Sequence, residues 1–390
     1  MNRVLRTALE RSLLVPFGAA IALVWASVAA ESYFRFASAL AFAVNDVAMA
    51  LFFALIAQEV LEATMPGGAL HTWRRTALPI AAALGGTVGA IAAYEAFVLA
   101  GDEPLLLAGW PIVCGIDGAI AYLLVQSLRG PASARPFVLL IVIVSNAIGL
   151  IVVGLHQQAA HLHEAGPLLI AGGIVISVTS AQLTPRRMWA QLAVSGTLMW
   201  WGFWWSGLHP ALALVPIVPF LPRSPRGLDF LTDSPGGPHD SARHLEHEMR
   251  IPVQIILLLF ALVNAGVVVR GVEPGAWAIP AGALVGRPIG ILVAVGVSLL
   301  FGLRLPLGLG MRELVVLAWT VSCSFTFGLF LATAVYPTGP VLMEAKVGAL
   351  STIAGAAIAT GAAWALGVGR FAAFAAPRRR VEAHLKRGRA

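Results

Sequence analysis

Long apolar runs alternate with short polar segments along the whole chain. Taken as helices, twelve of these runs approach or exceed the length needed to cross the roughly 30 Å hydrocarbon core of a bilayer. Several contain prolines and glycines, which packed membrane helices tolerate. The pattern therefore predicts transmembrane helices at residues 13–30, 38–62, 76–99, 108–127, 136–155, 166–183, 188–205, 207–221, 253–269, 277–302, 314–335 and 342–368.

Composition agrees with this pattern. Of the 390 residues, 58% are hydrophobic and only 12% are charged, and the mean hydropathy is +0.84. A soluble domain carries about 25% charged residues, so most of this chain must face lipid or other helices. Cys114 and Cys323, the only two cysteines, lie in apolar runs and indicate neither a disulfide framework nor a zinc site. The fold class predicted is an all-α polytopic membrane protein with about 12 transmembrane helices.

The basic residues indicate how the chain is threaded through the membrane. With both termini in the cytoplasm, nearly all of the 26 lysines and arginines fall in cytoplasmic segments. The exceptions are Arg35 and Arg270 in outside loops, and Arg287 and Lys346 within spans. Scattered in this way, the net charge of +7 is a topology signal, and we expect no nucleic-acid partner.

The loops predict a single domain. Residues 222–250 form the only long loop, and its His244-Leu-Glu-His-Glu piece suggests a short amphipathic helix leading into the ninth span. No linker is long enough to separate soluble domains. We therefore expect residues 1–390 to form one transmembrane transporter domain with both ends cytoplasmic.

Two charges lie deep in apolar runs. Asp117 is in the fourth span and Arg287 is in the tenth. Placing an ionised side chain in a bilayer core costs on the order of several kcal/mol unless the charge is paired or hydrated. Such residues mark ion or solute pathways. We expect Arg287 to lie within direct or water-bridged reach of Asp117, or of Ser145 or Asn146 in the fifth span.

Two spans are expected to be interrupted. The fourth has glycines at 115 and 118 beside Asp117, and the eleventh contains Ser322-Cys-Ser-Phe-Thr-Phe-Gly at a similar depth. Broken helices at matching positions suggest inverted repeats, with the two breaks crossing near the membrane midplane. Asp117 would then offset the positive ends of the half-helices.

The same residues resemble the bacterial Na+/H+ antiporter A (NhaA) family along nearly the whole chain. The matching stretches are Asn45-Asp-Val-Ala-Met-Ala-Leu-Phe-Phe, Gly109-Trp-Pro-Ile, Ile116-Asp-Gly-Ala-Ile-Ala, Ser206-Gly-Leu-His-Pro-Ala, Leu245-Glu-His, Leu259-Phe-Ala-Leu-Val-Asn-Ala-Gly-Val, Val285-Gly-Arg-Pro-Ile-Gly-Ile, Phe325-Thr-Phe-Gly-Leu-Phe and Ala345-Lys-Val-Gly. The resemblance implies a secondary antiporter of the bacterial inner membrane that exchanges Na+ or another monovalent cation for protons by alternating access, and so contributes to pH and sodium homeostasis.

The resemblance also implies an ion site, from which this chain departs. The family places an Asp beside the fourth-span break, which is Asp117 here, and a Lys in the tenth span, where this chain has Arg287. Its adjacent Asp pair in the fifth span is replaced by Ser145 and Asn146. Hydroxyls and amides do not titrate near neutrality, and an arginine effectively keeps its proton. Asp117 is then the one titratable group of a rebuilt site, with Ser145, Asn146 and Thr326 as neutral ligands. The alternative interpretation is that Ser145 and Asn146 only hydrogen-bond the two breaks together.

Other expectations follow from the resemblance. Glu59, with Glu62 nearby, matches an acidic cytoplasmic funnel, and Glu246 and His247 match a pH-responsive region. Solvated helix ends with ordinary charges are the alternative interpretation of these four residues. The family's β-hairpin between the first two spans does not fit the short connection from Ala30 to Ser38, so a homodimer would depend on helix packing.

Three functions remain open from sequence. The first is cation/proton antiport with the rebuilt site, the second is transport of another solute such as a small anion, and the third is a sensor or assembly subunit without transport. The spacing of the loop histidines 156, 161 and 163 fits no metal motif, and we expect no metal or cofactor. The chain has no Gly-x-Ser-x-Gly elbow or Walker loop, so enzymatic activity is not expected.

Overall fold

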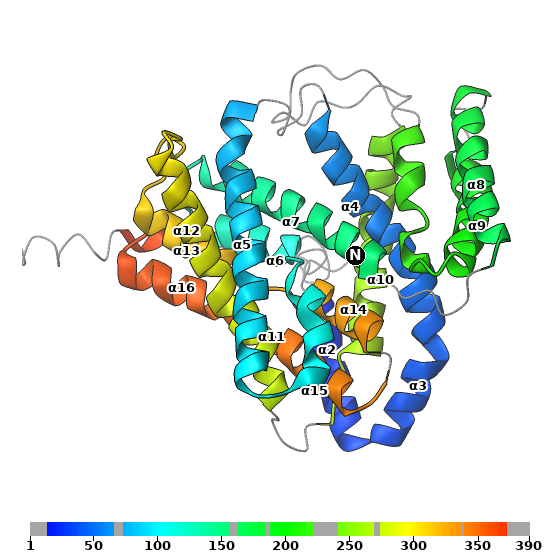
Figure 1. Ribbon diagram of the computed structural model, residues 1–390, viewed down its shortest axis with the longest axis horizontal. Coiled ribbons are helices and arrows are strands. Elements are labelled where there is room, and N and C mark those ends of the chain that lie inside the picture. Colours follow the sequence, from blue (N-terminus) through cyan, green and yellow to red (C-terminus); the bar gives the residue numbers. More distant parts are fainter. Residues whose placement is uncertain are drawn as a thin grey trace, which may run out of the picture. The chain divides into compact units, whose positions relative to one another are not determined.

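The described part of the protein is predominantly helical (Figure 1). The computed structural model describes residues 14–65, 73–156, 163–183, 188–221, 241–268, 274–336 and 338–372. Within those ranges it contains no β-strand. The all-α prediction is therefore confirmed.

The chain divides into two compact units, each assembled from separate stretches of sequence. The first comprises Met1–Trp73, Asn146–Val272 and Leu329–Lys346, and the second comprises Arg74–Ser145, Glu273–Gly328 and Val347–Ala390. Helices that belong wholly or mainly to the first unit are α2 (Leu14–Val28), α3 (Ala30–Phe42), η1 (Ala43–Ala48), α4 (Met49–Thr64), α8 (Ala165–Leu183), α9 (Met188–Trp205), η3 (Pro210–Leu212), η4 (Val215–Phe220) and α10 (Ser241–Asn264). Helices of the second are α5 (Trp73–Ala100), η2 (Pro104–Val113), α6 (Gly118–Leu128), η5 (Pro274–Trp277), α11 (Ala278–Pro280), η6 (Ala281–Gly286), α12 (Arg287–Leu300), α13 (Met311–Thr320), α16 (Ala354–Leu366) and η7 (Gly369–Phe371). Three helices belong to both: α7 (Ala134–His156), α14 (Phe325–Val335) and α15 (Pro340–Ser351).

The helices coincide with the apolar runs of the sequence. Among the described residues, five helices are long and apolar enough to cross a membrane, or up to seven if each of two bent helix pairs is one span. Four shorter apolar helices and α9 fall on the remaining predicted segments. Each of the twelve predicted segments thus corresponds to a helix or a bent pair of helices.

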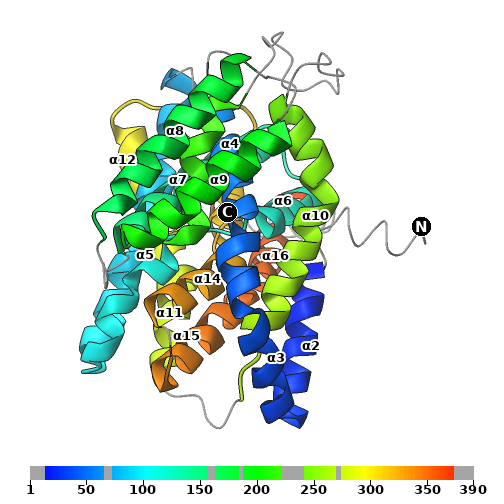
Figure 2. The same ribbon diagram turned by 90° about the vertical axis from the view of Figure 1, so that its right-hand side faces the viewer.

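In the first unit, α2 packs along α10, and α8 packs along α9 (Figure 2). A buried tyrosine fastens the end of α10: the Tyr33 hydroxyl donates to the Val263 carbonyl at 2.9 Å and accepts from the Gly266 N–H at 2.9 Å. The amides of Asn45 and Asn264 bond to each other reciprocally, at 3.2 and 2.7 Å. Because these contacts join residues far apart in sequence, they hold the second predicted span against the ninth.

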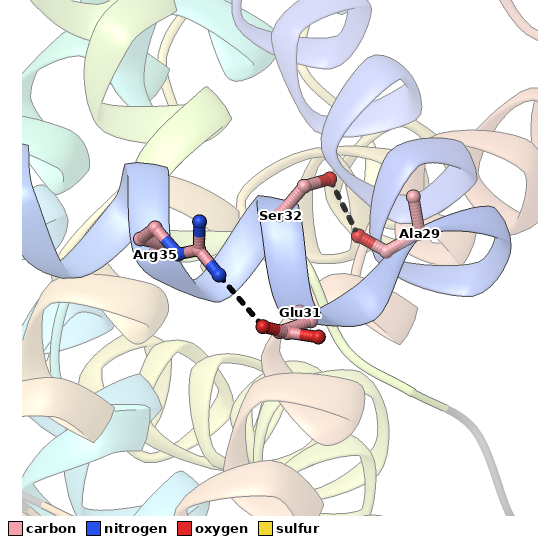
Figure 3. Close-up of polar contacts among 4 residues, drawn as sticks. All are labelled: Ala29, Glu31, Ser32 and Arg35. Atoms are coloured by element: carbon pink, nitrogen blue, oxygen red, sulfur yellow. Dashed lines mark hydrogen bonds and ion pairs between the residues drawn. The ribbon is translucent and has the colours of Figure 1, made fainter.

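The connection between the first two spans is a single residue. α2 ends at Val28 and α3 begins at Ala30, which leaves Ala29 between them. The Ser32 hydroxyl donates to the Ala29 carbonyl at 2.9 Å, and Arg35 pairs with Glu31 at 2.6 Å on the exposed side of α3 (Figure 3). No room remains for a β-hairpin at this place, as the sequence predicted.

In the second unit, α5 and α12 approach so closely that glycine is required at their contact. A Cβ at Gly286 would collide with the carbonyl oxygen of Gly89, and a Cβ at Gly290 would collide with that of Gly85. Small residues spaced four apart allow this approach between membrane helices. On its other side α12 packs on α13, which packs on α16 (Figure 1). These contacts fix the tenth span, and with it Arg287.

Candidate ion-binding site

Both predicted interruptions are present. The fourth span is formed by η2 and α6, bent by 56° at residues 114–117, and the eleventh by α13 and α14, bent by 45° at residues 321–324. Glycine is needed in the first break because a Cβ at Gly115 would overlap the ring of Phe327. The positions predicted for the breaks, near Gly115–Gly118 and Ser322–Thr326, are confirmed.

The two breaks bind each other through Asp117. Its backbone N–H donates to the Cys323 carbonyl at 2.9 Å, and its side-chain Oδ2 accepts from the Thr326 backbone N–H at 2.7 Å. Thr326 lies in the first turn of α14, where the backbone N–H groups have no partner within the helix. A carboxylate at that place offsets the positive end of the helix dipole. Asp117 therefore lies at the positive end of a half-helix, as the sequence predicted, and its role in ion binding stays a prediction.

Arg287 binds the opposite, carbonyl end of another half-helix, η2. It is the first residue of α12, directly after the π-helical turn η6, and it has no exposed surface. Its Nη2 donates to the carbonyl of Val113 and, at 2.9 Å, to that of Gly115. Val113 ends η2, so these carbonyls carry the negative end of that helix. Arg287 and Asp117 thus satisfy oppositely charged ends of two half-helices.

This arrangement differs from the direct contact that we considered between Arg287 and Asp117. Within the described residues no hydrogen bond or ion pair joins the two side chains. The physical reason is that the unwound backbone supplies both partners: carbonyls for the cation and an amide for the anion. Each charge thus has backbone partners of its own, although Nε and Nη1 of Arg287 have no hydrogen-bond partner among the described residues.

Ser145 and Asn146 are consecutive buried residues of α7. α7 packs on the start of α6, where a Cβ at Gly118 would lie 2.9 Å from Val142 Cγ1. Ser145 follows Val142 by one helical turn, and its hydroxyl oxygen is buried without a hydrogen-bond partner among the described residues. The division between the two compact units falls between Ser145 and Asn146, so only Ser145 belongs to the unit that holds Asp117.

The predicted funnel residues are placed only in part. Glu59 is exposed and Glu62 is partly buried on α4, where the Gln58 amide donates to Glu62 at 3.2 Å. Glu246 and His247 lie within α10, but their side chains are outside the described residues. The pH-responsive role of these four residues remains a prediction.

A carboxyl group within the second predicted span was not singled out from the sequence. Asp46 lies near the middle of the 35-residue helix Ala30–Thr64, in the π-helical segment η1, and is partly buried. The Trp200 indole donates to its backbone carbonyl at 3.2 Å. The carboxyl group within the apolar run 38–62 was the signal available in the sequence. The π-helical turn, a feature often found at functional sites, is seen only in the structure. Among the described residues, no group of three or more His, Cys, Asp or Glu side chains is arranged to hold a metal ion.

Sequence comparisons place these features in a known family. The chain matches the family described as Na+/H+ antiporter 1 over residues 2–365. It is 33% identical to the Na(+)/H(+) antiporter NhaA of Jannaschia sp. (strain CCS1), with 92% of this chain and 96% of the relative covered. It is also 33% identical to the NhaA of Geotalea uraniireducens (strain Rf4), with 93% and 97% covered.

A solved structure shows the same fold at low sequence similarity. The sodium proton antiporter MjNhaP1 from Methanocaldococcus jannaschii superposes with a TM-score of 0.57 at 12% identity, covering 91% of this chain and 90% of that one. Together with the apolar helices, these matches identify a multi-pass protein of the bacterial inner membrane. The chain belongs to the Na+/H+ antiporter 1 family.

Proposed function

We propose that this protein exchanges Na+, or another monovalent cation, for protons across the inner membrane, and that it has no enzymatic activity. The observation that carries the proposal is the Asp117 carboxylate, buried where two interrupted helices meet and bonded to the Thr326 amide at 2.7 Å. Antiporters are named among the relatives that match nearly the whole chain. We further propose one membrane domain with both termini cytoplasmic, and a homodimer formed through helix packing.

Exchange requires a group that binds either a cation or a proton, so that the two compete. The Asp117 carboxylate does this, because protonation removes the charge that attracts Na+. Hard cations also accept neutral oxygen ligands, and the buried Ser145 hydroxyl, Asn146 amide and Thr326 hydroxyl are the candidates that supply them. Arg287 is a fixed charge that satisfies the η2 carbonyls and does not release a proton.

A site with one titratable group limits the stoichiometry. When Asp117 exchanges one proton for one monovalent cation, no net charge crosses the membrane in the complete cycle. Transport should therefore be electroneutral and insensitive to membrane potential. The replacement of an Asp pair by Ser145 and Asn146 is what distinguishes this expectation from a two-proton exchange.

The test uses the purified full-length protein in sealed proteoliposomes. A preset pH gradient is followed with a fluorescent dye while Na+, Li+ or K+ is added, with the membrane potential clamped or released. The proposal is supported if at least one cation dissipates the pH gradient at a rate that does not depend on the membrane potential. If none of the three cations dissipates the pH gradient, the proposal is overturned.

A second function is favoured by one observation. Nε and Nη1 of Arg287 are buried without a hydrogen-bond partner among the described residues, as is the Ser145 hydroxyl. Donors of this kind on a buried guanidinium suit an anion or a neutral solute. If the cations are inert in the vesicle assay, uptake of small anions such as chloride, nitrate and formate is the next measurement.

A further inference from the structure

The twelfth predicted span has an irregular turn near its middle. α15 ends at Ser351 and α16 begins at Ala354. Between them the backbone bonds are of the three-residue type: Thr352 N–H to the Ala349 carbonyl at 3.2 Å, Ile353 to Leu350 at 3.3 Å, and Gly355 to Thr352 at 2.9 Å. A tight 3-10 turn inside a longer helix often marks a functional position or a strained one.

This turn lies against the break in the eleventh span, within the same compact unit. Thr352 is fully buried, and its hydroxyl accepts a hydrogen bond from the Ser324 N–H at 3.2 Å while donating to the Ala349 carbonyl at 2.6 Å. A Cβ at Gly355 would lie 3.6 Å from the Cys323 nitrogen. The turn therefore supplies a partner for a backbone N–H that the break leaves without one.

Two side chains from other spans satisfy the amides at the start of α14. Ser324, which precedes the first residue of the helix, donates to Thr352, and Thr326 in its first turn donates to Asp117. In the proposed exchange, Asp117 alternates between a proton and a cation. The Thr352 hydroxyl has no accessible proton equilibrium near neutrality. The start of α14 thus has one partner that changes during transport and one that does not.

We infer that Thr352 is a positioning residue of the ion site: its hydroxyl holds the start of α14 in place, so that the Thr326 N–H stays directed at Asp117 in every loading state. The inference rests on the proposed function. Without the hydroxyl, the Ser324 N–H has no buried acceptor, and the amide facing Asp117 is no longer held. Binding of the cation weakens, and protons compete with it more effectively.

The test compares Thr352→Val, which removes the hydroxyl at nearly constant shape, with Thr352→Ser, which keeps it. Thr320→Val is the matched control, because Thr320 is equally buried in the same unit and, among the described residues, its hydroxyl bonds to Val316 of its own helix, at 2.9 Å. In proteoliposomes, Thr352→Val should raise the KM for Na+ by about threefold to tenfold at pH 7, the equivalent of one hydrogen bond. The increase should be smaller at pH 8.5, and the maximal rate should be retained.

Wild-type behaviour of Thr352→Val, or equal effects of Thr352→Val and Thr320→Val, would overturn the inference. If wild-type protein exchanges no cation, the proposed function fails, and the positioning role is tested without transport. Hydrogen–deuterium exchange over residues 321–328 should then be faster in Thr352→Val than in Thr352→Ser or Thr320→Val, and equal rates would refute the role. Should Thr352→Val not fold, Thr352→Cys, whose thiol is a weak acceptor of similar size, is used in both measurements.

Discussion

The carboxylate of Asp117 accepts a hydrogen bond from the backbone N–H of Thr326 at 2.7 Å, while the Asp117 N–H donates to the Cys323 carbonyl at 2.9 Å. One residue of the fourth span therefore bonds the eleventh span both within its break, at Cys323, and just after it, at Thr326. In this arrangement the carboxyl group that we propose to bind the ion also joins the two interrupted helices. A change of occupancy at Asp117 acts directly on the contact between them.

Asp117→Asn should abolish exchange without separating the breaks. The amide oxygen can still accept from the Thr326 N–H, but the side chain no longer exchanges a proton near neutrality. We expect Na+-driven proton release from proteoliposomes to fall to the level of protein-free vesicles, with unchanged elution from a gel-filtration column. Asp46→Asn is the control, because it removes a partly buried carboxyl group from another membrane helix. Retained exchange in Asp117→Asn would refute the mechanism, as would loss of exchange in Asp46→Asn alone.

The pH dependence of cation affinity reports how many carboxylates bind a proton in competition with the cation. Protonation of Asp117 blocks cation binding, so the KM for Na+ should rise as the pH falls. With a single group the rise is at most about tenfold per pH unit, whereas two coupled carboxylates can give a steeper dependence. The measurement is the KM for Na+ between pH 6 and pH 9, with the membrane potential clamped at zero. A change in log KM of well above one per pH unit would show a second titrating group, for which Asp46 is the first candidate.

Restoring carboxylates in the fifth span should strengthen cation binding. Changing Ser145 and Asn146 together to Asp places negative charge in buried positions of α7. Attraction for a cation at about 4 Å is on the order of 4 kcal/mol at an effective dielectric of 20, and desolvation offsets part of it. We expect the KM for Na+ at pH 8.5 to fall by about tenfold or more, and exchange to become sensitive to membrane potential. The neutral variant Asn146→Gln should show neither change, and an unaltered KM in the double variant would place these residues outside the site.

The close approach of α5 and α12 predicts a difference between two glycines of one helix. A Cβ at Gly290 would meet the Gly85 backbone, whereas a Cβ at Gly296 would have nothing within 4 Å. Overpacking of this kind typically costs about 1–3 kcal/mol, while glycine to alanine in an open helical position is neutral or gains up to about 1 kcal/mol. Gly290→Ala should therefore lower the melting temperature in detergent, and Gly296→Ala should not. Equal melting temperatures would mean that the two helices separate at little cost.

The sequence alone determined the class of the protein and the positions of its breaks. Apolar runs of membrane length specify helices because an unpaired backbone group in lipid is too costly to leave, and this constraint acts on each run separately. The breaks were predictable for a similarly local reason: glycines at 115 and 118 flank Asp117 in one apolar run, and a cluster of serines lies in the other. The family followed from short stretches in the expected order, which the match over residues 2–365 confirms.

Only the tertiary structure decided which groups satisfy the buried charges. Arg287 binds the carbonyls of Val113 and Gly115, and the Ser324 amide binds Thr352. Every residue has a backbone carbonyl, and nearly every residue has an N–H, so a sequence cannot show which of them a break leaves unpaired. That depends on where the helices end and which spans pack together. The charges of the site could therefore be named from sequence, but their partners became known only when the broken helices were placed against each other.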